Sequence, residues 1–230
     1  MQIGIISDIH GNFDALEVIL RAFERKNVEK IICLGDMIGY FHQSIAVLDR
    51  LMELKVSAIC GNHEAYLLGS LSYPPERAGI YNLDYVHKAI SPKALHWLAS
   101  LPTKLHLTIE GKIISFFHGS PWDPLQEYIY PDYPQFEKFL TIDSDYLFLG
   151  HTHYPFYKKI ETKSIGNPGS VGLPRNGDNR AQAAIFDIGS KFLLEFIQEE
   201  YNIERFLESA QKHGVHIITI QRLIKTSKDL

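Results

Sequence analysis

Four short strings of histidine, carboxylate and amide side chains carry the chemistry of this chain: Asp8-Ile9-His10, Gly35-Asp36, Gly61-Asn62-His63-Glu64 and Gly150-His151-Thr152-His153. One more histidine follows an apolar run at residues 113–117. Imidazole nitrogens and carboxylate or amide oxygens, without a thiolate, suit Mn, Fe, Zn, Co or Ni better than Cu(I) or an Fe–S cluster. Seven candidate donors are too many for one tetrahedral ion but suffice for two ions that share a carboxylate. They are Asp8, His10, Asp36, Asn62, His118, His151 and His153.

Strands are the elements that must position these donors. Each string follows an apolar run that is typical of a strand, at residues 3–6, 31–34, 56–60 and 146–149. Apolar residues at helical spacing separate the first three runs, which predicts a βαβαβ start with parallel strands. Ligands of open α/β sheets collect beyond the carboxyl ends of the strands. We therefore expect the strands to bring the donors to one point in space.

The remainder of the chain shows no internal repeat and no clear linker. We expect a single domain over residues 1–230, with a small helical cap at about 65–100, where the pattern is irregular and Pro74-Pro75 acts as a breaker. The later elements predicted are a hairpin over 105–117, a hairpin over 183–197 turning at Gly189-Ser190, a helix from Ile203 that ends at Gly214, a last strand or docked tail at 215–220, and a frayed end at 225–230.

Composition limits the classes of partner. The formal charge is -4, which does not suit a protein that holds long nucleic acid through a broad basic surface. No apolar stretch approaches the 18 residues of a membrane span, and no signal peptide opens the chain. Cys33 and Cys60 are expected to be buried, reduced thiols. The expected compartment is the cytoplasm, with no membrane partner.

The ordered set of strings resembles the calcineurin-like metallophosphoesterase superfamily, and within it the small bacterial and archaeal phosphodiesterase-like group. The resemblance covers Met1 to about Asp187. It implies an α/β (α+β) fold, a four-layer αββα sandwich of two mixed β-sheets flanked by helices. It also implies two divalent metal ions, of which Mn is favoured and Fe, Zn, Co or Ni are alternatives. By this resemblance the first ion is held by Asp8, His10 and His153, the second by Asn62, His118 and His151, and Asp36 bridges them.

The resemblance further implies the reaction. A hydroxide activated by the two metals attacks a small phosphodiester or phosphomonoester, which includes nucleotides, and no covalent enzyme intermediate forms. His63, next to the ligand Asn62, is the candidate general acid for the leaving oxygen. Glu64 either orients His63 or caps the following turn.

Three residues are candidates for binding the substrate phosphate. Arg175 and Arg180 follow the glycine-rich stretch 167–172, and a guanidinium binds phosphate oxygens in a bidentate manner. Asn12 is a candidate for either a phosphate contact or a helix cap. The Ser/Thr phosphatase branch has a phosphate-binding Arg where this chain has Tyr40, which argues against that branch. Five further aromatic residues either stack on a base or pack the cap, namely Tyr66, Tyr73, Tyr81, Trp122 and Tyr128.

Two other functions are open at this stage. One is hydrolysis of a dinucleoside polyphosphate, with the aromatic residues holding the base. The other is a non-catalytic scaffold of the same fold, which the loss of a metal ligand or of the His after Gly61-Asn62 would indicate; none is missing here. The sequence leaves open the physiological substrate, the native metal, the preference for monoester or diester, and the oligomeric state, for which a homo-oligomer is allowed.

Overall fold

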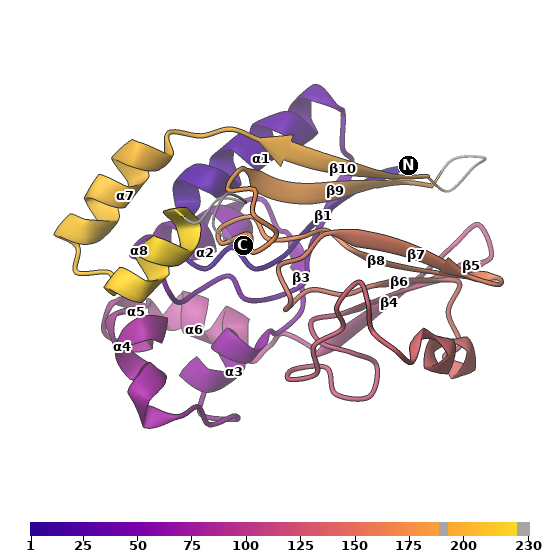
Figure 1. The fold of residues 1–230 in the computed structure, drawn as a ribbon, viewed down its shortest axis with the longest axis horizontal. Coiled ribbons are helices and arrows are strands. Elements are labelled where there is room, and N and C mark those ends of the chain that lie inside the picture. The colour runs from indigo at the N-terminus through magenta and orange to yellow at the C-terminus, as the bar shows by residue number, and fades with distance from the viewer. Residues whose placement is uncertain (189–192, 225–230) are drawn as a thin grey trace.

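The computed structural model of the protein describes residues 1–188 and 193–224, and shows two five-stranded sheets packed face to face (Figure 1). The first sheet has the order β10-β9-β1-β2-β3 and the second β4-β5-β6-β8-β7. Both sheets mix parallel and antiparallel pairs. The strands are β1 Gln2–Ile6, β2 Lys30–Cys33, β3 Ser57–Ala58, β4 Lys104–Ile109, β5 Lys112–Phe117, β6 Tyr146–Phe148, β7 Phe156–Ile160, β8 Lys163–Asn167, β9 Ala181–Asp187 and β10 Leu193–Glu199.

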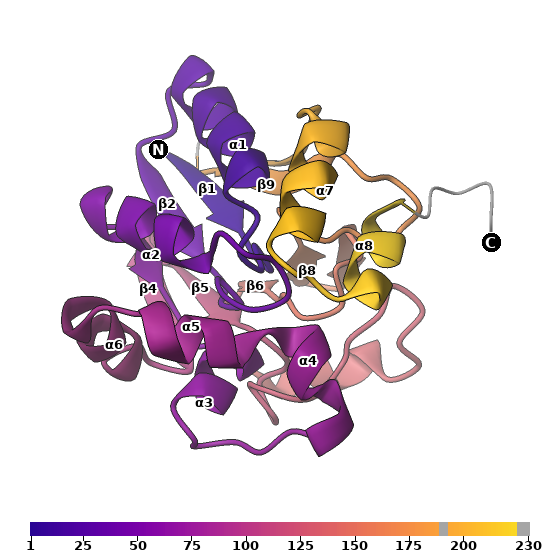
Figure 2. The same ribbon diagram turned by 90° about the vertical axis from the view of Figure 1, so that its left-hand side faces the viewer.

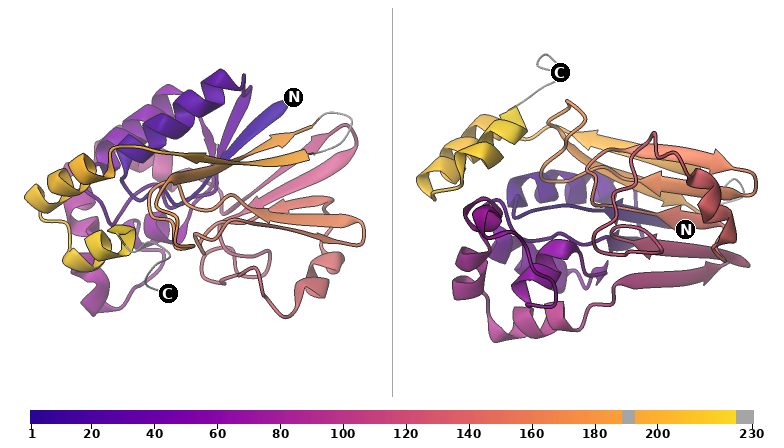
Figure 3. Two further views of the ribbon diagram at one scale, coloured as in Figure 1. Left: turned by 45° about the horizontal axis from the view of Figure 1, so that its top comes forward. Right: turned by 60° about the horizontal axis from the view of Figure 1, so that its bottom comes forward.

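Helices flank the two sheets. Helices α1 and α2 lie along one face of the first sheet, α3 to α6 form a group below them, and α7 and α8 pair beside that group (Figure 2). Figure 3 shows α7 and α8 side by side at one end of the molecule, away from the outer ends of the sheets. The helices are α1 Phe13–Arg25, α2 Ser44–Glu53, α3 Asn62–Leu67, α4 Ala78–Tyr81, α5 Leu83–Ala89, α6 Pro92–Ala99, α7 Ile203–Lys212 and α8 Ile217–Ile224, with 3₁₀ turns η1 Pro75–Arg77 and η2 Phe136–Thr141.

Alternate side chains of β1 face two different layers of the fold. Ile3 and Ile5 point between the sheets, where they pack with Phe116 of β5, while Ile6 faces the layer of α1 and α2. Successive side chains of a strand face opposite ways, so one strand supplies both cores. Helix α1 covers this outer face with Leu16 and four other fully or almost fully buried apolar residues, Ala15, Ile19, Ala22 and Phe23.

The predicted fold is confirmed: two mixed sheets flanked by helices, opening with parallel β1, β2 and β3. One local prediction was wrong. The third strand is much shorter than 56–60, because only Ser57 and Ala58 pair with β2. Of the two alternatives for residues 215–220, the strand is wrong and the segment instead docks on the body. It does so as a helix, α8 from Ile217, because Thr219, Ile220 and Leu223 bury at helical spacing. The predicted turn at Gly189-Ser190 and the end at 225–230 lie outside the described residues.

Residues 62–99 hold the short helices α3 to α6. Across residues 1–188 and 193–224, every helix is too short or too polar to cross a membrane.

Candidate metal centre

Five strand ends supply the predicted donors. Strands β1, β2 and β3 deliver Asp8 and His10, Asp36, and Asn62, while β5 and β6 of the second sheet deliver His118, His151 and His153. The structure brings all seven together, and all are at least nine-tenths buried. Ligand-type atoms within 4.8 Å of one another form three overlapping groups. Two of them contain only predicted donors, Asp8 with His10 and His153, and Asp36 with His118 and His151, and the third joins His10 and Asp36 to His63.

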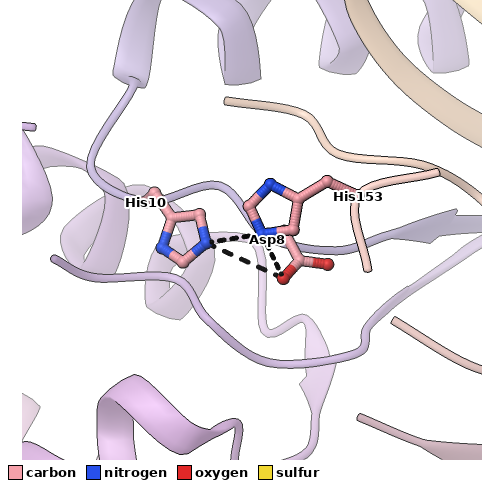
Figure 4. Close-up of side chains that lie close together, drawn as sticks. All are labelled: Asp8, His10 and His153. Atoms are coloured by element: carbon pink, nitrogen blue, oxygen red, sulfur yellow. Dashed lines mark hydrogen bonds and ion pairs between the residues drawn. The ribbon is translucent and has the colours of Figure 1, made fainter. Parts of the chain in front are cut away.

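The first group is slightly more buried than the second, and Figure 4 shows its three side chains close together. The Nε2 atoms of His10 and His153 lie 3.2 Å apart, and Asp8 Oδ1 lies 3.2 Å from His153 Nε2. Asp8 Oδ2 accepts hydrogen bonds from Ser7 Oγ and from the His151 amide, whereas Oδ1 has no hydrogen-bond partner. The free oxygen and the two nitrogens therefore face one small space.

The second group has the same character. His118 Nε2 lies 2.9 Å from Asn62 Oδ1, 3.1 Å from His151 Nδ1 and 3.4 Å from Asp36 Oδ2. Asp36 Oδ2 is also 3.6 Å from His10 Nε2 of the first group. Asp36 thus lies between the groups, which is the position that a bridging carboxylate needs.

Backbone carbonyls orient three of the imidazoles. The Nδ1 atoms of His10, His118 and His153 donate to the carbonyls of Ile38, Leu34 and Leu173, at 3.2, 2.8 and 2.5 Å. A proton on Nδ1 leaves Nε2 as a lone-pair donor, and such outer hydrogen bonds are the usual support of metal-bound histidine. Two Nε2 lone pairs at 3.2 Å repel each other unless a cation lies between them. The donors therefore fit divalent cations.

The ligand loops hold strained backbone. Asp8, His10, Asp36, His151 and His153 all have φ between +51° and +67°. Side chains other than glycine rarely adopt this left-handed region, and such outliers cluster at functional sites. The bend lets His151 and His153, which are separated by one residue, face different ligand groups. An extended chain would point them in opposite directions.

Electrostatics prepare the donors. Burial acts to raise the pKa of Asp36, but His118 and His63 hold it well below its usual value. Burial acts to lower the pKa of His118, yet Asp36 raises it to about 9. Burial lowers the pKa of His10 well below its usual value and that of His151 to about 3. The metal-free centre thus holds ionised carboxylates, one imidazolium at His118, and neutral imidazoles elsewhere.

His63 lies on the open side of the two groups, at the start of α3. Its amide donates to Asp36 Oδ1 at 2.9 Å. The ring is enclosed by Tyr40 and Tyr81, with centroids at 4.9 and 4.7 Å. Its Nδ1 has no hydrogen-bond partner and faces Gly39, where a Cβ would come within 2.2 Å. Burial lowers the pKa of His63 to about 4.

The Glu64 side chain binds backbone amides of two loops. Its carboxylate accepts the backbone amides of Asp36 and Gly61 on Oε2, at 2.8 and 2.9 Å, and those of Met37 and Ile38 on Oε1, at 2.8 and 3.3 Å. Capping of the following turn was one of the two predicted roles. Glu64 also holds the loop that carries Asp36. The sequence gives no signal for this role, because a hydrogen bond from a backbone amide does not depend on the residue type of the donor.

A narrow cleft of ≈ 20 Å³ opens onto the groups. That volume is room for about one water molecule. Beside the donors, its lining contains Tyr40, His63, Tyr81, Tyr128 and Arg175. The Tyr128 ring stacks on His151 with centroids 3.8 Å apart.

The predicted phosphate ligands separate in the structure. Arg175 lines the cleft. Arg180 instead pairs with Asp178 and Gln198 and is absent from that lining. Asn12 caps α1 by accepting the Ala15 amide, and its Nδ2 donates to the Gly172 carbonyl and to Tyr201 Oη. These contacts use the Asn12 side chain for structure.

The glycine-rich stretch 167–172 packs under the ligand loops. Asn167 Nδ2 donates to the Gly150 carbonyl and to Thr152 Oγ1, between the two ligand histidines of that loop. A Cβ on Gly172 would lie 1.8 Å from the Ile9 carbonyl oxygen. The close approach that these glycines permit is thus to the chain's own backbone.

The other aromatic candidates take different positions. Tyr66 and Tyr73 pack with Tyr81 beside the cleft, at centroid distances of 5.7 and 5.4 Å. Trp122 packs on Phe139, 4.9 Å away.

The sequence carries no signal for the backbone carbonyls of Leu34, Ile38 and Leu173 that orient the ligand histidines, because every residue type has a carbonyl.

Comparison with known proteins agrees with this geometry. An uncharacterised protein of Methanocaldococcus jannaschii is 34% identical over 235 residues, covering 92% of this chain and 93% of that protein. The phosphodiesterase YfcE of Escherichia coli is 24% identical over 190 residues, covering 77% of this chain and 83% of YfcE. A metallophosphoesterase structure from Sphaerobacter thermophilus superposes with a TM-score of 0.85 at 30% identity, covering 98% of each chain.

The family model of the calcineurin-like phosphoesterase superfamily domain matches residues 1–191. This range contains both ligand groups, His63 and Arg175. Because this match covers most of the chain, the chain belongs to the calcineurin-like phosphoesterase superfamily.

Proposed function

We propose that this protein is a dinuclear metal-dependent phosphoesterase that hydrolyses a small phosphodiester or phosphomonoester. The observation that carries the proposal is the convergence of imidazole lone pairs and carboxylate oxygens in two groups that share Asp36. Membership of a phosphoesterase family and likeness to a phosphodiesterase support the same reaction.

The residues divide the work of holding the metals. Asp8, His10 and His153 hold the first ion, Asn62, His118 and His151 the second, and Asp36 bridges both. When bound, two such ions supply a water nucleophile of lowered pKa and neutralise charge on the phosphoryl group. Manganese is favoured, with Fe, Zn, Co or Ni as alternatives, because the donors are oxygen and imidazole.

His63 donates a proton to the leaving oxygen. Its ring lies in the cleft lining beside the donors, between Tyr40 and Tyr81. With its pKa lowered to about 4 by burial, the ring needs the negative charge of a bound phosphate to keep the proton. Catalysis by His63 therefore depends on substrate being in place.

Arg175 binds the substrate phosphate. It is the single Lys or Arg in the described lining of the cleft, and the other lining residues near it are neutral rings such as Tyr128. One guanidinium matches the single charge of a phosphodiester better than the several charges of a dinucleoside polyphosphate, so the alternative substrate is not favoured. Tyr128, which stacks on His151 and is 46% exposed, forms the outer wall that the ester group meets.

The experiment that tests this function is a metal analysis joined to a substrate panel. Protein purified without chelator and saturated with Mn should hold two ions per chain. It should then hydrolyse bis-p-nitrophenyl phosphate or p-nitrophenyl phosphate faster than cyclic nucleotides or dinucleoside polyphosphates. A chain that never holds more than one ion, or that hydrolyses none of these esters, contradicts the proposal.

A further inference from the structure

The C-terminal hairpin, which we define as α7, α8 and the turn between them (residues 203–224), packs against the segments that carry the metal centre. It lies beyond residues 1–191, which the family model matches. Figure 2 shows α8 beside α4, where Thr219 Oγ1 donates to the Ile80 carbonyl at 3.5 Å. One apolar cluster joins hairpin residues to site segments: Phe206, Ala210, Val215, Ile220 and Leu223 pack with Tyr40, Phe41, Ile80 and Leu173.

The first connection runs through Leu173 to His153. The Leu173 side chain is fully buried in this cluster, and its carbonyl accepts the Nδ1 proton of His153 at 2.5 Å. That hydrogen bond fixes the tautomer and the direction of the imidazole. A shift of Leu173 toward a gap in the hairpin core would therefore turn His153 away from Asp8.

The second connection runs through residues 40 and 41 to His10. The Phe41 ring packs edge-to-face on Phe206 of α7 at 4.9 Å, and the Phe41 amide donates to the His10 carbonyl at 3.1 Å. Tyr40, with φ at +56°, lays its ring against the His10 imidazole at 4.6 Å. A residue in the left-handed region persists only when its surroundings enforce it, and the hairpin is part of those surroundings.

A third connection lies at the entry to α7. Tyr201 Oη accepts a hydrogen bond from Asn12 Nδ2 at 2.9 Å, and the same Nδ2 donates to the Gly172 carbonyl at 3.0 Å. The Gly172 amide in turn donates to the Asp8 carbonyl at 3.1 Å. His153 and His10 are thus each tied to the hairpin through one residue, Leu173 and Phe41. Asp8 is tied through Gly172 and Asn12 to Tyr201, just before the hairpin.

We propose that the C-terminal hairpin is a positioning element for the first ligand group, Asp8, His10 and His153, and sets its affinity for metal. This inference rests on the proposed two-metal centre. The second group has different support, because Phe117 and Leu149, which precede His118 and the Gly150-His151 string, pack in a separate cluster with Phe139 of η2. The hairpin therefore acts on one ion position and not on the other.

A matched pair of leucine truncations tests the proposal. Leu223 of α8 and Leu98 of α6 are each 1% exposed, but they belong to different clusters. Both Leu223→Ala and Leu98→Ala should lower thermal stability. When Mn²⁺ is titrated into the metal-free full-length protein, Leu223→Ala should weaken one of two sites about tenfold, the lower end of the loss seen when an outer partner of a ligand is disturbed. Leu98→Ala should leave both sites as in wild type.

A second arm assigns the affected site. His153→Ala removes a donor of the first group, so Leu223→Ala added to it should cause no further loss of Mn²⁺ affinity, because coupled residues are non-additive. If Leu223→Ala does not fold, Phe206→Leu keeps the cluster apolar and should give the same site-selective loss of a few-fold. Equal effects of Leu223→Ala and Leu98→Ala, or additive losses with His153→Ala, would overturn the proposal. The titration needs no substrate, so it fails or succeeds independently of the proposed hydrolysis.

Discussion

The two ligand groups share Asp36 but differ in what surrounds them. Asp8, His10 and His153 lie beneath backbone that the C-terminal hairpin packs against, and none of the three is more than 1% exposed. In the other group, His151 lies against Tyr128, which is 46% exposed. Both groups reach the cleft, the first through His10 and His153 and the second through Asn62 and His151, but the segments packed behind them differ. The comparison teaches that a pair of chemically similar ion positions can differ chiefly in their packing.

Replacing Asp36, the carboxylate that lies between the two groups, is expected to have the largest effect. Asp36→Asn should abolish measurable hydrolysis and leave at most one Mn ion per chain, because it removes the anionic oxygen that lies between the groups. Elemental analysis and activity on a phosphodiester measure the two effects. Asp14→Asn on α1, outside both groups, is the control and should keep two ions. Retention of two ions in Asp36→Asn would mean that the groups do not depend on a shared ligand.

His63 separates metal binding from proton transfer. His63→Ala should keep both ions yet lose about 10²–10⁴-fold in rate, the range for a general acid. The loss should be largest for alkoxide leaving groups and small for p-nitrophenolate, which departs without a proton. Equal losses for both leaving groups would instead assign His63 an electrostatic or positioning role.

Two arginines, one in the cleft lining and one outside it, form a matched pair for mutation. Arg175 lines the cleft, whereas Arg180 is engaged by Asp178. Arg175→Ala should lower kcat/KM without loss of metal. The decrease should correspond to a loss of about 1.5–3 kcal/mol of transition-state stabilisation, as expected for a charge-assisted hydrogen bond. Arg180→Ala should leave kinetics within error. Should Arg175→Ala behave like Arg180→Ala, the phosphate is held by the metals, His63 and backbone amides alone.

The smallest expected effect is a difference in pH dependence between the groups. Asp36 raises the pKa of His118 to about 9, so in the metal-free protein this ligand carries a proton at neutral pH. Metal must displace that proton, and Mn²⁺ affinity at the second group should rise about tenfold per pH unit up to pH 9. Burial lowers the pKa values of His10 and His153, so the first group should show no such rise.

The raised pKa of His118 also determines how the stability of the folded chain depends on pH. Because the pKa of His118 is higher in the folded metal-free chain than the ordinary 6.5, its ion pair with Asp36 stabilises that chain fully below pH 6.5. The contribution is lost as pH rises toward 9. Mn²⁺ titrations at pH 6.5, 7.5 and 8.5, with thermal unfolding of the metal-free protein at each pH, measure both trends. A pH-independent second group would contradict the assignment of the proton to His118.

The sequence predicted the parts of the site that depend on residue type. Strand-like runs ending in His, Asp and Asn placed the donors at one sheet edge, since the carboxyl ends of parallel strands meet there. The family resemblance supplied the division into two groups. The structure brings the donors together, and their division between two ions stays a prediction.

Other features could not be read from the sequence, because they depend on tertiary contacts. The apolar run at 215–220 suits a strand by composition, yet packing on α7 and on the Tyr40 loop makes Ile217–Ile224 a helix. Arg175 and Arg180 look alike in the sequence, and only the neighbouring Asp178 distinguishes them. The carbonyl of Leu173 that orients His153 has no sequence signal.

The Glu64 carboxylate has a consequence for how the metal loops unfold. It accepts hydrogen bonds from four backbone amides in two loops, those of Asp36, Met37, Ile38 and Gly61. Within the part of the chain that the structure describes, these amides do not pair with a neighbouring strand. Loop amides usually exchange with solvent through small local openings, whereas these four can open only if one buried carboxylate releases them together. Their exchange is thereby joined to that of the central strands. We therefore expect the loop that carries Asp36 to open with the global folding unit and not by itself.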